Sequence, residues 1–140
     1  MKGVSYLGAL NGATPVFLIH MPGPMACAAI SINVGSVDEE DMPSAKRGVE
    51  HFLEHLVFSK RNAKGVPFST IGQILGLEYN AFTAMDNTGV FSDFARDDAE
   101  GVLSLLWEAC FDTANSVTSS SIVHEGGAVA NEYLLSLIHI

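Results

Sequence analysis

The chain has 140 residues, of which 48% are hydrophobic and 16% charged, a composition that fits one globular domain and excludes a disordered chain. Sixteen acidic and seven basic residues give a formal net charge of −9, which argues against nucleic acid and anionic membranes as partners. The longest apolar run, residues 26–34, is too short to span a bilayer, and no secretory signal is recognisable at the N-terminus.

The predicted strands lie in the first third and in the middle of the chain. Residues 16–19 form a short β-type run, and residues 26–34 alternate weakly and are rich in Ile and Val. Residues 79–85 and 89–95 are two further β-type runs, and Asp86-Asn87 between them predicts a hairpin. These runs predict a mostly antiparallel sheet.

Helical patterns alternate with these strands. Ser44 is a candidate N-cap for a helix that runs to about Ser59, and residues 70–77 predict a short helix. Apolar residues recur at helical spacing over 97–110, and a last helix is expected to begin at 118–121 and to include Glu132. The predicted fold class is α+β, with helices packed on one face of the sheet.

The two cysteines, Cys27 and Cys110, are far apart in sequence and form no C-x-x-C pair. Mostly apolar or small residues flank each of them, so both are expected to be buried, inert thiols.

Residues 135–140, Leu-Ser-Leu-Ile-His-Ile, end the chain within the predicted last helix. These six residues also correspond to a translated transposon-end adapter of the kind used in sequencing libraries. We therefore interpret 135–140 as a non-native tail on a truncated fragment, and expect residues 1–134 to form an incomplete N-terminal domain.

The strongest chemical signal is the stretch from His51 to His55, which reads His-Phe-Leu-Glu-His. At 100° per residue, His51, Glu54 and His55 fall within one arc of about 100° on a helix. Two imidazoles one turn apart can bind one Zn²⁺, and a carboxylate beside them can take a proton from a metal-bound water. This is the inverted order H-x-x-E-H, although such a pattern also arises by chance on helix surfaces.

A catalytic zinc site needs a third protein ligand, and the last predicted helix offers two candidates. Glu125 and Glu132 are two turns apart and therefore share one face. Ala128 and Val129 between them are small enough to let this helix approach the histidine helix. The alternative is that both glutamates belong to a solvated acidic face.

These distances, together with several short stretches, resemble the pitrilysin/insulinase family of zinc peptidases. That family places a ligand Glu at a similar distance after the second His, with another Glu seven residues earlier; here 132 − 55 = 77 and 132 − 125 = 7. The resemblance covers roughly residues 8–134. Its other matching stretches are Leu10-Asn11-Gly12, Val34-Gly35-Ser36, Gly48 before His51, Leu56-Val57-Phe58 after His55, and Gly76 through Tyr79-Asn80-Ala81-Phe82-Thr83.

The resemblance implies a role for each matching residue. His51, His55 and Glu132 would ligate Zn²⁺, and Glu54 would be the general base. Glu125 resembles the residue that steadies a ligand histidine from outside the metal shell. Asn80 and Ala81 resemble edge-strand residues that hold a peptide backbone by strand addition.

The implied function is a zinc-dependent endopeptidase acting on peptides or small unfolded polypeptides. Family members combine similar α+β domains, so this chain is expected to need a second domain, half or subunit, and to be weakly active or inactive alone. One departure from the family pattern is Glu50, which replaces a small residue just before the first histidine.

Three other interpretations remain open at this point. The chain could be a non-catalytic partner subunit of a peptidase complex, although such subunits usually lose motif residues. It could be a zinc lyase of the S-ribosylhomocysteine type, whose third ligand is a cysteine, although Cys110 has no comparable context. Finally, the motif helix could bind no metal.

Overall fold

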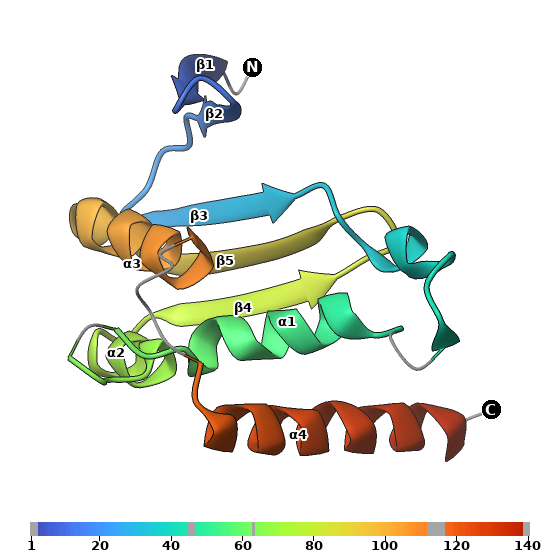
Figure 1. Ribbon diagram of the computed structural model, residues 1–140. Coiled ribbons are helices and arrows are strands. Elements are labelled where there is room, and N and C mark those ends of the chain that lie inside the picture. Colours follow the sequence, from blue (N-terminus) through green and yellow to red (C-terminus); the bar gives the residue numbers. More distant parts are fainter. Residues whose placement is uncertain (1–2, 45–46, 63, 112–116, 139–140) are drawn as a thin grey trace.

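A computed structural model describes residues 3–44, 47–62, 64–111 and 117–138 (Figure 1). Its centre is a three-stranded antiparallel sheet with the strand order β3-β5-β4. Among the described residues, four α-helices, short 3-10 helices and a separate two-stranded hairpin complete the fold. The elements are β1 Val4–Leu10, β2 Thr14–Ile19, β3 Met25–Ile32, η1 Ser36–Glu39, α1 Val49–Ser59, α2 Phe68–Ile74, β4 Glu78–Thr83, β5 Thr88–Ala95, η3 Arg96–Asp98, α3 Ala99–Phe111 and α4 Ser119–Ile138.

The core lies on one face of this sheet. Val90 and Phe94 of β5 point to that face and pack against Val102 and Leu106 of α3, all four being buried. Val57 and Phe58 of α1 pack against the same cluster, so α1 and α3 cover the same side of the sheet. Helix α4 lies alongside α1 as a further layer (Figure 1). The predicted α+β class, with helices on one face of an antiparallel sheet, is confirmed.

The β1–β2 hairpin lies apart from the central sheet (Figure 1). The sequence predicted its second strand but not β1. Strand β1 contains a register shift between Tyr6 and Gly8, and Gly8 has a φ of 120°. Such a bulge breaks the simple alternation by which a strand is recognised in sequence.

The prediction that Ser44 caps the first helix is wrong, because α1 begins at Val49 and its N-cap is Gly48. Gly48 has a φ of 89°, a left-handed conformation that glycine adopts without strain and that interrupts the helix. The predicted end of this helix near Ser59 is confirmed.

The expectation that both cysteines are buried is wrong for Cys27. Ala26 and Ala28 of β3 face the core, so Cys27 between them points to the uncovered face of the sheet and is exposed. Cys110 of α3 packs against the core cluster. Within the described residues, no helix is both long and apolar enough to cross a membrane.

This one-sided packing predicts that iodoacetamide labels Cys27 well before Cys110 at about pH 8, where reactivity follows the thiolate fraction. Burial raises the pKa of Cys110 to about 11, against a smaller lowering effect of Lys60. Burial and the nearby Asp93 carboxylate also raise the pKa of Cys27, so it should react more slowly than free cysteine. Peptide mass spectrometry over time measures both rates. Equal rates in the folded chain would contradict this packing.

Candidate metal centre

Helix α1 places the two motif histidines one turn apart on a partly exposed face. The rings of His51 and His55 meet edge to face, with 4.9 Å between their centroids. Leu56 on the opposite side of α1 is buried, and Val57 and Phe58 pack against the core cluster. The apolar side of α1 therefore anchors it to the sheet and turns both imidazoles toward α4.

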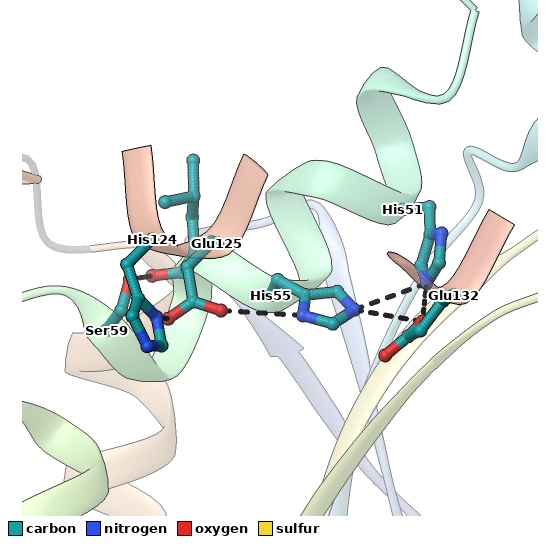
Figure 2. A network of polar contacts seen from close by, with 7 residues as sticks. His51, His55, Ser59, His124, Glu125 and Glu132 are labelled. Atoms are coloured by element: carbon teal, nitrogen blue, oxygen red, sulfur yellow. Dashed lines mark hydrogen bonds and ion pairs between the residues drawn. The ribbon is translucent and has the colours of Figure 1, made fainter. Parts of the chain in front are cut away.

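Glu132 of α4 completes a compact triangle with these histidines, as Figure 2 shows. Its Oε2 atom lies 3.3 Å from His51 Nε2 and 3.5 Å from His55 Nε2. The two Nε2 atoms are themselves 3.3 Å apart. Of the described residues, these three form the one group of three or more potential metal ligands.

The dimensions of this triangle are those of a zinc site. Four ligands placed tetrahedrally at bond lengths of about 2.0–2.1 Å lie roughly 3.3–3.4 Å from one another. Two imidazole nitrogens and a carboxylate oxygen are also donors that zinc prefers. The side chains of His51 and Glu132 are 39% and 53% exposed, so the centre is open to solvent.

Glu125 contacts His55 from the side opposite the triangle. Its Oε2 atom lies 3.5 Å from His55 Nδ1, while its Oε1 atom lies 3.2 Å from Nδ1 of the exposed His124 (Figure 2). A carboxylate at Nδ1 favours the tautomer in which Nε2 carries the lone pair, and Nε2 is the atom that faces Glu132. Glu125 and Glu132 thus contact opposite nitrogens of one ring.

Glu54 is not part of the triangle; it lies between the two histidines in sequence and reaches the end of strand β4. The hydroxyl of Thr83 donates a hydrogen bond of 2.6 Å to Glu54 Oε2. Sequence reasoning assigned no role to Thr83, although it matched the stretch that contains it. Ala81 and Thr83 lie on the same face of β4, and Ala81 packs toward the core, so the contact of Thr83 with Glu54 forms only when β4 packs beside α1.

Asn80 and Ala81 lie on β4, which forms one edge of the three-stranded sheet. The side-chain oxygen of Asn80 accepts a hydrogen bond of 2.9 Å from the backbone N–H of Ala81. The two residues point to opposite faces, with Ala81 toward the helices. Strand β4 packs against α1, so this edge runs beside the helix that carries the histidines.

The fold and this cluster define an α+β domain with an open His-His-Glu centre, and comparison with known proteins places it in a family. The model of the insulinase family, peptidase family M16, matches residues 16–134. This chain belongs to that family.

Individual relatives agree with the family match. A zinc protease PQQL-like protein of Arabidopsis thaliana is 35% identical over 80% of this chain and 12% of its own length. The β subunit of the mitochondrial-processing peptidase of Dictyostelium discoideum is 29% identical over 60% of this chain and 18% of its own. An uncharacterized zinc protease of Mycobacterium leprae (strain TN) is 30% identical over 69% of this chain and 22% of its own length. The chain therefore spans less than a quarter of each of these relatives.

A solved structure supports the fold. The crystal structure of a protease from Helicobacter pylori superimposes with a TM-score of 0.78 at 24% sequence identity. The match covers 94% of this chain and 31% of that one.

The geometry of the centre depends on how closely α4 approaches α1, and two adjacent glycines test this. A Cβ atom at Gly126 would lie 3.8 Å from the ring of Phe52, whereas one at Gly127 would meet nothing within 4 Å. We expect Gly126→Leu to be less stable than Gly127→Leu by about 1–3 kcal/mol, the usual cost of overpacking. Chemical unfolding measures both, and Gly127→Leu controls for the change in helix propensity. Equal stabilities would show that Gly126 does not face α1.

Proposed function

We propose that this chain is the zinc-bearing portion of a zinc-dependent endopeptidase. In this proposal His51, His55 and Glu132 hold the metal and Glu54 is the general base. The observation that carries it is the triangle of ligand atoms, whose edges of 3.3, 3.3 and 3.5 Å fit a tetrahedral zinc. Membership of the insulinase family and the zinc protease names of two relatives support the same assignment.

Bound zinc would supply a water whose pKa is lowered to about 7 and would polarise the scissile carbonyl group. The residues of the chain would transfer the proton and hold the reacting groups in position. Glu54 would accept the proton of the attacking water and pass it to the leaving amine. Thr83 would hold the Glu54 carboxylate through its hydroxyl, and Glu125 would fix the ring of His55 through Nδ1.

The substrate would be an extended peptide that adds to the free edge of β4. Asn80 and Ala81 lie on this edge, and backbone hydrogen bonds along it would recognise a peptide without regard to most of its side chains. The Asn80 oxygen that now accepts from the Ala81 N–H would have to move if that N–H is to pair with substrate.

We propose further that residues 1–134 are part of a larger peptidase domain, and that efficient cleavage needs a second domain, half or subunit. The small share of each relative that the chain spans supports this proposal. Residues 135–140 lie outside the family match, and their assignment as a non-native tail stays a prediction.

The competing interpretations have less support. A non-catalytic subunit is disfavoured because the three candidate ligands and Glu54 are all present. A zinc lyase with a cysteine ligand is disfavoured because Cys110 packs against the apolar core cluster, away from the two imidazoles.

Zinc stoichiometry tests the proposed ligands. We expect about one zinc per chain by elemental analysis, and its loss in His55→Ala and in Glu132→Gln, because each removes one of three protein ligands. Glu125→Gln should keep zinc but bind it about 10-fold more weakly, as for other residues that orient a ligand. His20→Ala, at an exposed histidine directly after β2, is the matched control and should bind normally. Zinc retained in Glu132→Gln would exclude Glu132 as a ligand.

A second pair of variants tests the proposed base. Glu54→Gln should retain zinc and lower the cleavage rate about 10²–10⁴-fold, because a neutral amide cannot accept the proton. Thr83→Val should lower the cleavage rate roughly tenfold, which corresponds to the loss of one hydrogen bond to a charged group. Thr83→Ser keeps the hydroxyl and should restore the rate. Mass spectrometry of a mixture of unstructured peptides, with long incubation, detects even slow cleavage. Cleavage by Glu54→Gln at the parent rate would exclude Glu54 as the base.

A further inference from the structure

The N-cap residue of α1 does not cap the helix with a side chain of its own. Its N-cap residue is Gly48, which carries no side chain to accept the unpaired N–H groups of the first turn. Two N–H groups at this end of the helix, those of Gly48 and Glu50, are instead paired with Glu39, nine residues before Gly48. One carboxylate oxygen of Glu39 closely contacts the N–H of Gly48, and the other accepts a hydrogen bond of 3.0 Å from the N–H of Glu50.

Glu39 is only 4% exposed, which makes these two contacts energetically significant. A buried carboxylate is costly unless hydrogen-bond donors surround it, and here both oxygens face backbone donors. Its negative charge also lies at the positive end of the helix dipole, which is a favourable interaction. Since both partners are donors, a neutral glutamine would satisfy one of them and turn its own NH₂ group toward the other.

The segment that carries Glu39 is itself fixed to the sheet. The N–H groups of Ser36 and Val37 donate to the carbonyls of Ala84 and Met85, at 3.1 and 2.9 Å, in the connection between β4 and β5. Gly35 fits against the same connection so closely that a Cβ atom there would lie 2.6 Å from the Ala84 oxygen. Glu39 therefore joins the first turn of α1 to the end of β4.

We propose that Glu39 is a positioning residue for the metal centre. It fixes the first turn of α1 at Glu50, the residue immediately before His51, while the Thr83–Glu54 hydrogen bond fixes the same helix one turn further on. Contacts at two successive turns resist sliding and rotation of α1 against the end of β4. This constraint fixes the position in which α1 presents His51 to Glu132 of α4. The inference deepens the proposed function and rests on it.

Metal affinity in Glu39→Gln tests this role, with Glu40→Gln as the matched control. Glu40 is the exposed neighbour, and its replacement removes the same charge. We expect Glu39→Gln to bind Zn²⁺ about 10-fold more weakly in chelator competition, as for residues that orient ligands from outside the metal shell, and Glu40→Gln to bind normally. The visible absorption of the Co²⁺ form should change only in Glu39→Gln. A loss of thermal stability with unchanged Zn²⁺ affinity and Co²⁺ absorption would reduce Glu39 to a structural role and overturn the proposal.

Amide hydrogen exchange of the parent chain tests the contact itself without metal. The N–H groups of Gly48 and Glu50 should be protected, although the first N–H groups of a helix generally have no acceptor within the helix, and the protection of Glu50 should fall in Glu39→Gln. Exchange as fast as in an open loop would overturn the proposal even if Glu39→Gln does not fold. Protected amides in a chain that binds no Zn²⁺ would instead contradict the proposed function and leave Glu39 as the residue that fixes this turn.

Discussion

The candidate centre depends on the close approach of two helices that are far apart in sequence. His51 and His55 share one turn of α1, and Glu132 reaches them from α4, which packs against α1 at Gly126, where a Cβ atom would lie 3.8 Å from the ring of Phe52. A larger side chain at this contact would separate the helices and enlarge the triangle. Ligand distances tolerate only a few tenths of an ångström, so the metal centre depends on this packing contact as well as on the identity of its ligands.

The surroundings of His55 concentrate negative charge where a divalent cation would be attracted. The carboxylates of Glu125 and Glu132 both lie within 3.5 Å of its ring. A Zn²⁺ ion held by the triangle would offset part of this negative charge. Bound metal would also join α1 to α4, and any ligand that binds only the folded chain stabilises it. In this small domain, the centre would therefore contribute to stability as well as to catalysis.

Much of this arrangement could be predicted from local sequence periodicity. The shared face of His51, Glu54 and His55 follows from the helical repeat, and the common face of Glu125 and Glu132 follows in the same way. The order of strands and helices after residue 60 also followed from local patterns. That Glu132, and not only Glu125, meets the histidines required the family resemblance, since periodicity alone treats the two alike.

The parts that could not be predicted all depend on partners distant in sequence. Ser44 has the chemistry of an N-cap, yet the cap of α1 is supplied by Glu39, and no local pattern links a carboxylate to an N–H nine residues away. Thr83 acquires its contact with Glu54 only when β4 packs beside α1. Cys27 is exposed because nothing in the described residues covers the second face of the sheet. Local patterns describe the residue types at these positions, but tertiary packing determines which of them cap a helix, contact Glu54 or remain exposed.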